Sequence, residues 1–490
     1  MRDRPADEGL MTMHTANAPQ VIYPIHFMDA PTGQCDCNCD CACSTPSQFP
    51  EAGLQDGPLF LKENIYYKNI SPGWVMAYGP DCRPALLNTP ALELLHSYPD
   101  SHRDGLNVGL PQLQEKTIRE LSYLGYLKAS NPVFQPHRVT THTLTAWLQV
   151  TNRCNLRCPY CYSANQPQDM PFQVGEKIIA SLIRCAQSGS YQKVKIKFGG
   201  GEPLLRFDWM LSLADFASQT LARSNLEMEA IVLSNGLLLT QRMLDGFMQR
   251  GLRLMISLDD LELGRVGAQG RLGSKIINAI DLALANGLIP DISVTVTGQN
   301  TQNLPALVAW LCDRRLPFNL NFFRAHAASP KEFGLELTSA SDTESILAAL
   351  EVAVRIWPER SLIDGMLDRI NFTNPHEYPC DAARNYLVFD PGGNISTCQM
   401  DQEDALTHCQ TADPLLVIQE HAADKHNPSV KDKSGCEACE WRTACAGGCP
   451  ALARFSFGSA TAGTPYCEFY KTIFPQIIGL EGQRLLNLSS

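Results

Sequence analysis

Short apolar runs alternate with amphipathic stretches between about residues 143 and 330. The runs are rich in β-branched residues and predict six strands, TLTAWLQV, KVKIKF, EAIVLS, LRLMISL, ISVTVT and FNLNFF. The stretches between them have helical spacing of three and four, as in Ile178, Ile179, Leu182 and Ile183. Six repeated strand–helix units predict an α/β fold whose parallel sheet forms an open or partial barrel. In such folds ligands gather at the carboxyl ends of the strands, so chemistry is expected in the loops that follow them.

A smaller sheet-and-helix unit is predicted upstream of this barrel. Between Leu59 and Lys128, two helical stretches follow three β-prone runs, NIYYKNI, WVMAYGP and RPALLN. The first helical stretch carries Leu92, Leu94 and Leu95, and the second carries Leu113, Ile118, Leu121 and Leu124.

The two ends of the chain lack a sustained period. The N-terminal end is rich in Pro, Ala, Asp and Cys, which predicts a flexible extension with little regular structure. Beyond Thr338 a helix leads into a cysteine-rich region whose fold we expect to depend on bound metal. The pattern therefore predicts an extension, a small α+β domain, a barrel and a cysteine-rich domain, at residues 1–57, 58–135, 140–335 and 336–490.

Composition excludes several kinds of partner. The formal charge of −11 results from 40 Lys and Arg against 51 Asp and Glu, so no basic surface for nucleic acid is expected. No stretch approaches the ~18–20 consecutive apolar residues that span a bilayer, and the N-terminus lacks the apolar core of a signal peptide. We therefore expect a cytoplasmic protein without a membrane partner. In that reducing compartment the 19 cysteines are expected to bind metal or serve redox chemistry rather than form disulfides.

Three cysteines follow the first barrel strand directly. The segment TNRCNLRCPYCY places Cys154, Cys158 and Cys161 on one tight loop with CxxxCxxC spacing. Three thiolates can hold three corners of a [4Fe–4S] cluster and leave the fourth iron open. Structural zinc needs four ligands, and no clear fourth partner is close in sequence. The spacing alone leaves iron–sulfur and zinc open.

This loop, its Tyr160, and the segment FGGGEP after the second strand together resemble the radical S-adenosylmethionine (SAM) superfamily. The resemblance implies that SAM chelates the open iron, that one electron cleaves it, and that the resulting radical abstracts hydrogen from carbon. It also implies that Gly200, Gly201 and Glu202 bind the methionyl ammonium group. Further contacts to SAM are implied for Tyr160 and for four polar residues at strand ends, which otherwise read as helix caps: Ser234, Asn235, Ser257 and Asp259. Many relatives have Ser-x-Asp-Gly at the fourth strand, and this chain has Asp260 in place of the glycine.

The C-terminal cysteines resemble the SPASM extension of radical SAM enzymes that modify peptides and proteins. Gly393 and Cys398 form a Gly-x4-Cys motif, and the later spacing is CxxC-x5-C-x3-C-x17-C. The resemblance implies two auxiliary iron–sulfur clusters, [4Fe–4S] in type. One would be bound by Cys436, Cys439, Cys445 and Cys467, and the other by Cys380, Cys398 and Cys449. Without the upstream loop, these cysteines read as two zinc sites.

The set of Cys380, Cys398 and Cys449 has one ligand fewer than the family pattern. Relatives with all ligands carry another cysteine where this chain has Asn374. Cys409, His376 or the substrate are candidates to fill this position. Cys82, Cys185 and Cys312 are expected to be ordinary buried residues.

The small N-terminal domain resembles the winged-helix peptide-recognition element of the pyrroloquinoline-quinone peptide chaperone family. The residues that carry this resemblance are the three β-runs, LLNTPALELL and LQEKTIRELSYLGYL. Such elements bind a leader peptide as an added strand at a sheet edge. The alternative is a docking domain that binds no peptide. Upstream, the segment CDCNCDCAC (Cys35 to Cys43) suggests metal binding, a thiol relay, a mimic of a peptide substrate, or an unstructured tail.

The leading hypothesis is a radical SAM enzyme that modifies a residue of a ribosomally made peptide to form a cross-link or an oxidised residue. Its expected partners are a peptide or protein with a leader segment and a reductase such as flavodoxin or ferredoxin. One alternative is a protein maturase of the sulfatase-maturing type, and another is an iron–sulfur carrier without catalysis. No residue stands out as a general base, so the sequence assigns no catalytic side chain.

Overall fold

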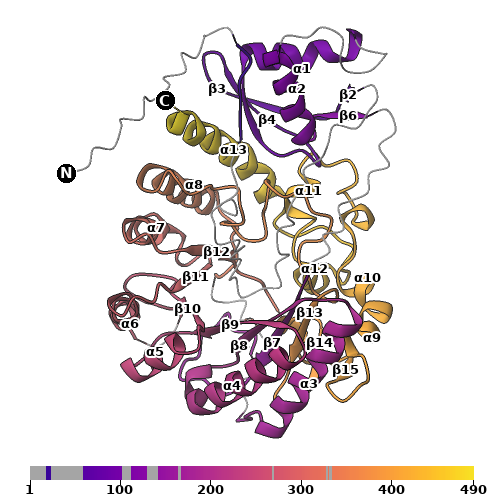
Figure 1. The fold of residues 1–490 in the computed structure, drawn as a ribbon. Coiled ribbons are helices and arrows are strands. Elements are labelled where there is room, and N and C mark those ends of the chain that lie inside the picture. The colour runs from indigo at the N-terminus through magenta and orange to yellow at the C-terminus, as the bar shows by residue number, and fades with distance from the viewer. Residues whose placement is uncertain are drawn as a thin grey trace, which may run out of the picture.

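The computed structural model describes residues 18–23, 59–101, 112–129, 142–163, 167–267, 270–326, 329 and 334–489. Figure 1 shows a curved sheet with helices on its outer side, and a smaller unit packed above it beside the long C-terminal helix. None of the helices in these ranges combines the length and apolar character needed to cross a bilayer.

The curved sheet contains all six predicted strands in sequence order, each parallel to the next. It has nine strands in the order β12-β11-β10-β9-β8-β7-β13-β14-β15. The predicted strands are β7 (Thr143–Gln149), β8 (Lys193–Gly199), β9 (Glu227–Ser234), β10 (Arg253–Ser257), β11 (Asp291–Val296) and β12 (Phe318–Phe322). This confirms the α/β class and the parallel sheet.

Alternation along the strands separates two faces of the sheet. In β8, Val194, Ile196 and Phe198 belong to the main core, whereas Lys195 and Lys197 alternate with them and face the inner side. The helices that cover the outer face are α3 (Phe172–Ser188), α4 (Phe207–Arg223), α5 (Gln241–Met248), α6 (Gly273–Ala285), α7 (Leu304–Asp313) and α8 (Ala340–Ile356).

Charged side chains on the inner face form a chain of ion pairs across four strands. Lys195 Nζ lies 2.8 Å from Glu229 Oε1, which is 3.6 Å from an Arg253 nitrogen. A second Arg253 nitrogen lies 3.1 Å from Asp291 Oδ2. Burial raises the pKa of Glu229, but Lys195 and Arg253 outweigh burial and hold that pKa below its ordinary value. These pairs compensate the charges that the inner face removes from water.

The sheet continues beyond the predicted barrel into the C-terminal region. β13 (Tyr386–Phe389) pairs with β7 in parallel, and β14 (Asn394–Ser396) and β15 (Thr407–His408) follow in antiparallel order. The sequence analysis did not predict these strands. The helices of this region are α9 (Pro414–His421), α10 (Ala423–His426), α11 (Arg442–Cys445), α12 (Pro450–Phe457) and α13 (Cys467–Ser489).

The N-terminal unit contains the three predicted β-runs and both predicted helices. Its sheet has the order β1-β5-β4-β3, and two strands pair separately as β2-β6. The elements are β2 (Leu59–Leu61), β3 (Tyr66–Ser71), β4 (Trp74–Tyr78), β5 (Ala85–Asn88), α1 (Thr89–Ser101), α2 (Gln112–Tyr123) and β6 (Leu127–Ala129). The remaining strand, β1, is Val21–Ile22. Little regular structure is predicted over residues 1–57, and of these the structure describes only residues 18–23, which include this two-residue strand. Cys35 to Cys43 lie outside the described residues.

Aromatic side chains join the N-terminal unit to the C-terminal region. The ring of Trp441 stacks on Tyr78 with centroids 5.2 Å apart, and lies 5.1 Å from the ring of Tyr66. On its other sides Trp441 contacts Phe474 at 5.5 Å and Phe372 at 6.1 Å. Because Trp441 is only 3% exposed, its burial depends on both units being in place.

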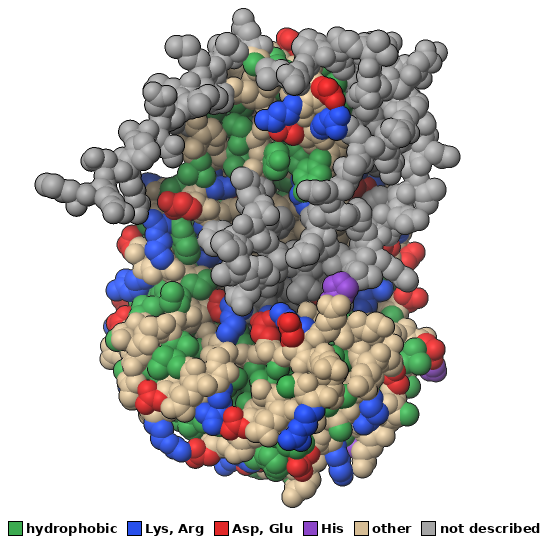
Figure 2. Space-filling view, viewed as in Figure 1, with side chains coloured by type: hydrophobic (Ala, Val, Ile, Leu, Met, Phe, Trp, Pro, Cys, Tyr) green, Lys and Arg blue, Asp and Glu red, His purple; other side chains and the backbone are tan. Residues whose placement is uncertain are grey.

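Acidic and basic side chains are interspersed on the face seen in Figure 2, where the lower half shows no continuous patch of one sign. This distribution agrees with a chain in which 51 acidic residues exceed 40 basic ones without long runs of like charge.

We expect Trp441→Ala to lower the free energy of unfolding by about 3–5 kcal/mol, because it removes a large buried ring and leaves a cavity. Phe457→Ala is a matched control, since that ring is 58% exposed. Urea unfolding followed by near-UV circular dichroism measures both variants. Equal destabilisation by the two would contradict the interface described here.

The contribution of Glu229 to stability should decrease at acid pH. Its folded-state pKa lies below the ordinary value, so the charged form stabilises the fold above that ordinary value and loses its effect as pH falls through the folded pKa. The difference in unfolding free energy between the wild type and Glu229→Gln should therefore shrink from pH 7 to pH 3. Glu227→Gln, on a carboxylate whose side chain is 76% exposed, should show a small difference throughout. A Glu229→Gln difference independent of pH would exclude this role.

Candidate functional site

The three predicted thiols lie together on the loop that follows β7. Cys154 and Cys158 are partly buried, and Cys161 is exposed. The amide of Leu156 donates to Cys154 Sγ at 3.3 Å, and the amide of Cys161 donates to the carbonyl of Cys158 at 3.1 Å. Burial, together with the charges of Glu202, Cys161 and Cys158, raises the pKa of the Cys154 thiol to about 11, and the Leu156 amide opposes this shift. Thiols that oppose one another's ionisation in this way release protons when a metal binds them.

The glycine run after β8 lies against the backbone of this loop. The amide of Gly201 donates to the carbonyl of Thr151 at 2.8 Å, and the amide of Glu202 donates to that of Arg153 at 2.9 Å. A Cβ atom on Gly201 would lie 2.2 Å from the Arg153 carbonyl oxygen, and Gly200 has a φ of +142°. Only glycine permits this approach.

The carboxylate of Glu202 joins the loops after β8 and β9. It accepts hydrogen bonds from the Leu204 amide at 3.0 Å, from Ser234 Oγ at 2.8 Å and from the Asn235 amide at 2.9 Å. Burial raises the pKa of Glu202, and these three donors oppose that shift. Asn235 then reaches the cysteine loop, because its Nδ2 donates to Asn155 Oδ1 at 2.8 Å.

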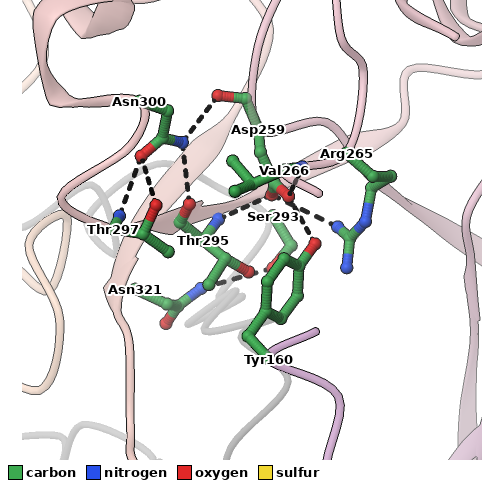
Figure 3. A network of polar contacts seen from close by, with 9 residues as sticks. All are labelled: Tyr160, Asp259, Arg265, Val266, Ser293, Thr295, Thr297, Asn300 and Asn321. Carbon is green, nitrogen blue, oxygen red and sulfur yellow. Dashed lines mark hydrogen bonds and ion pairs between the residues drawn. The ribbon is translucent and has the colours of Figure 1, made fainter. Parts of the chain in front are cut away.

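Asp259 is the second buried carboxylate at this edge, and Figure 3 shows the network around it. Its side chain is fully buried and accepts hydrogen bonds from Tyr160 Oη, from the Val266 amide at 3.2 Å and from the Thr295 amide at 2.9 Å. A nitrogen of Arg265 lies 3.3 Å from the carboxylate, and its guanidinium lies over the Tyr160 ring. Asp259 therefore ties the cysteine loop to the strand ends. Ser257, the last residue of β10, is partly buried.

Sequence reasoning missed several residues that hold this edge. Asn300 Nδ2 donates to the backbone carbonyls of Asp259 and Thr295, at 2.9 Å in each case. Asp169 accepts from Thr151 Oγ1 at 2.5 Å and forms ion pairs with two arginines, Arg153 at 2.6 Å and Arg206 at 2.8 Å. The position of Asn300 after β11 was the available signal for that residue, whereas Thr295 lies within β11, and Asp169 and Arg265 lie in loops without such a marker.

Electrostatic effects link members within each of the two predicted sets of C-terminal cysteines. In the first, Cys398 and Cys449 are coupled to Cys380, because thiolate charge in this group raises the pKa of Cys380 and Cys398 beyond the effect of burial. The second group is linked in the same way, and its members are Cys436, Cys439, Cys445 and Cys467. Among the residues described by the structure, no three His, Cys, Asp or Glu side chains converge closely enough to hold a single metal ion.

Cationic side chains accompany both groups. Burial raises the pKa of Cys449, yet Arg369 and Arg324 outweigh it and hold that pKa below its ordinary value. Lys433 is fully buried, and its Nζ donates to the carbonyls of Ala446 at 2.9 Å and Gly448 at 3.0 Å. Burial lowers the pKa of Lys433, while the charges of Cys380 and Cys445, one from each group, oppose this. Lys433 therefore interacts electrostatically with thiols of both sets.

The remaining candidate ligands lie apart from one another. Cys409 packs beside Gly393, and its carbonyl accepts a hydrogen bond from Arg184 of α3 at 3.0 Å. His376 is close to Lys433, and burial lowers the pKa of His376 to about 4. Asn374 is 6% exposed, in the loop that precedes His376. The expectation of ordinary burial is confirmed for Cys82, Cys185 and Cys312, each 0% exposed.

Comparison with known proteins identifies the barrel. Residues 148–311 match the model of the Radical SAM superfamily. The chain is 32% identical over 120 residues to the uncharacterized protein MJ0907 of Methanocaldococcus jannaschii, a match over 24% of this chain and 40% of that protein. It is 24% identical over 359 residues to PqqA peptide cyclase of Bradyrhizobium diazoefficiens, a match over 68% of this chain and 89% of the cyclase.

Solved structures show the same fold. Native anSMEcpe with bound AdoMet superposes with a TM-score of 0.55 at 17% identity, over 69% of this chain and 99% of that one. Native anSMEcpe with bound AdoMet and Cp18Cys peptide gives a TM-score of 0.54 at 17% identity, over 69% and 98%. The family match assigns residues 148–311, which include the three-cysteine loop and the parallel strands that follow it, to the radical SAM superfamily, and the solved structures share the fold.

Proposed function

We propose that this chain is a radical SAM enzyme that modifies a residue of a peptide. The observation that carries the proposal is the loop of Cys154, Cys158 and Cys161, which two buried carboxylates, Glu202 and Asp259, help to fix at the carboxyl edge of the parallel sheet. A rigid loop with three thiols on one side of a polar barrel is what a cluster with one open iron requires.

The donor set fits a [4Fe–4S] cluster. Cys154, Cys158 and Cys161 would hold three of its irons, and the Leu156 amide already donates to one of these sulfurs at 3.3 Å. When bound, the cluster supplies the electron that cleaves SAM and starts hydrogen abstraction from the substrate. The chain's own part is to hold the loop, to bind SAM along the glycine run, and to place the substrate against the inner face.

The cofactor contacts are assigned to the edge built by the strand ends. Backbone atoms of Gly200 and Gly201 lie beside the cysteine loop, and Oε2 of Glu202 accepts a hydrogen bond from the Asn235 amide. A carboxylate oxygen accepts about two hydrogen bonds, so Glu202 retains capacity for the methionyl ammonium group. Ser234 and Ser257 complete this edge, and Asp259 acts on it by orienting Tyr160.

The C-terminal cysteines are assigned to two auxiliary iron–sulfur clusters. Cys436, Cys439, Cys445 and Cys467 supply four ligands to one, and Cys380, Cys398 and Cys449 supply three to the other. The buried ammonium of Lys433 and the guanidinium of Arg369 offset the negative charge of these ligand sets, which favours electron acceptance. Of the open candidates, His376 is favoured as the remaining ligand. The charge of Lys433 lowers the pKa of His376, and Lys433 in turn interacts electrostatically with Cys380.

A peptide is the substrate that the relatives support. The cyclase that matches 68% of this chain acts on PqqA peptide by its name, and one anSMEcpe structure contains a bound peptide. The N-terminal unit adds a sheet of the kind that binds extended chains at an edge. Turnover also requires an electron, for which we propose a flavodoxin-like or ferredoxin-like reductase as partner.

The direct test is reductive cleavage of SAM. Anaerobically reconstituted protein with SAM and dithionite should form 5′-deoxyadenosine, measured by liquid chromatography. Cys158→Ala should abolish this product and remove about four iron atoms per chain. Cys312→Ala is the matched control, because Cys312 is buried in the helical layer and should leave both iron and product unchanged. Absence of the product from wild-type protein with an intact cluster would overturn the enzyme assignment.

A second variant separates the two kinds of cluster. Cys439→Ala should retain SAM cleavage but lose peptide modification, because it disturbs a group distant in sequence from the SAM-binding loop. Iron content should fall by about four atoms per chain in this variant too. Mass spectrometry of the peptide and quantitation of 5′-deoxyadenosine distinguish the two functions. Equal loss of both products in Cys439→Ala would refute the separate roles.

A further inference from the structure

The edge of the N-terminal sheet is already occupied by the chain itself. β1 pairs with β5 in antiparallel register, Val21 opposite Leu87 and Ile22 opposite Leu86. The Asn88 amide donates to the carbonyl of Gln20 at 3.2 Å. Residues 18–23 thus add a strand from a distant part of the sequence to the outer side of β5.

The side chain of Asn88 makes two polar contacts to this added strand. Asn88 Oδ1 accepts from the Gln20 amide at 2.8 Å, and Asn88 Nδ2 donates to the carbonyl of Ala18 at 2.7 Å. Both contacts are made to the backbone of the added strand. Because these Asn88 contacts are to main-chain atoms, Asn88 can bind extended segments of many different sequences.

The side chains of the strand face two different cores. Val21 and Tyr23 pack against the small core of the N-terminal unit, which contains Leu87 and Leu95. Ile22 packs against the main core of the molecule, to which Leu86 belongs. Val21, Ile22 and Tyr23 remain partly exposed, whereas Leu86 and Leu87 are fully buried. Successive side chains at this edge therefore make apolar contacts with the two cores in turn, and the contact of Ile22 is with the main core.

The ladder between β1 and β5 is short. Its ladder has two residues, and a hydrogen bond contributes about 0.5–1.5 kcal/mol net. Ordering the segment costs about 1–2 kcal/mol per residue in backbone entropy. These opposing contributions are similar in size, so a strand this short can exchange with another extended chain.

We propose that the β5 edge binds an extended segment of the peptide substrate, and that residues 18–23 occupy this edge as an intramolecular placeholder which the substrate displaces. The identity of the incoming chain rests on the proposed function, whereas the placeholder does not. The preferred segment has three consecutive apolar residues, in the places of Val21, Ile22 and Tyr23. The placeholder raises the peptide concentration that is needed for binding, because a tethered strand competes at an effective concentration on the order of millimolar.

Binding of a labelled peptide to the full chain tests this proposal. The probe is a fluorescein-labelled peptide with the sequence of residues 16–25, ANAPQVIYPI. Fluorescence anisotropy measures its affinity for the wild type and for Ile22→Pro, because proline cannot donate a ladder hydrogen bond. We expect Ile22→Pro to bind the probe about tenfold or more tightly than the wild type. Ile22→Val keeps a β-branched strand residue and should match the wild type.

A second variant tests the same displacement without a proline. A full chain in which residues 18–23 are replaced by Gly-Ser repeats should also bind the probe more tightly and should melt within a few degrees of the wild type. Equal affinity of the wild type and both variants, or loss of the fold in both variants, would show that β1 is a permanent part of the sheet and overturn the proposal. The binding assay contains no SAM, so formation of 5′-deoxyadenosine by the same preparations reports separately on the proposed function.

Discussion

The candidate site depends on two buried carboxylates that fix one loop against a sheet edge. Asp259 binds Tyr160 of the cysteine loop and the amide of Thr295 in the next strand, β11. Glu202 binds Ser234 and the amide of Asn235, and Asn235 in turn binds Asn155 of the same loop. An ionised carboxylate is costly to bury unless several donors surround it. Each of these carboxylates therefore requires its partners, and through them it fixes the position of the three thiols.

This arrangement explains why the glycine run belongs to the site even before any cofactor is considered. Gly200 and Gly201 let the strand β8 continue its hydrogen bonding past its own end, onto the carbonyls of Thr151 and Arg153. A side chain on Gly201 would meet the Arg153 oxygen at 2.2 Å and separate the two loops. The same residues that a cofactor would contact thus first determine whether the cysteine loop can close on the sheet.

The sequence allowed much of the fold to be predicted where a pattern was long enough. The six barrel strands, the outer helices, and the strands β3 and β4 and both helices of the small N-terminal unit have runs of five residues or more. β13 was missed because YLVF is a four-residue apolar run, which periodicity cannot assign, and its pairing with β7 is a long-range event. β1 was missed for the same reason, since the short stretch between Pro19 and Pro24 gives no pattern. The site residues found by motif lie at strand ends, whereas Arg265 and Asp169 act through loop geometry that no local pattern encodes.

Trp441 connects the N-terminal unit with the C-terminal cysteines. It lies between Cys439 and Cys445 in the sequence, and its ring stacks on Tyr78 of the N-terminal sheet. Two residues later, Thr443 Oγ1 accepts a hydrogen bond from the amide of Asp81 at 3.0 Å, so the same short segment contacts the unit twice. The segment that carries Cys439 and Cys445 and the sheet that contains β4 and β5 are therefore parts of one packed body. A chain bound at the β5 edge would meet Leu86, whose side chain belongs to the main core, and its position would be set relative to the cysteine-rich region rather than to the barrel alone.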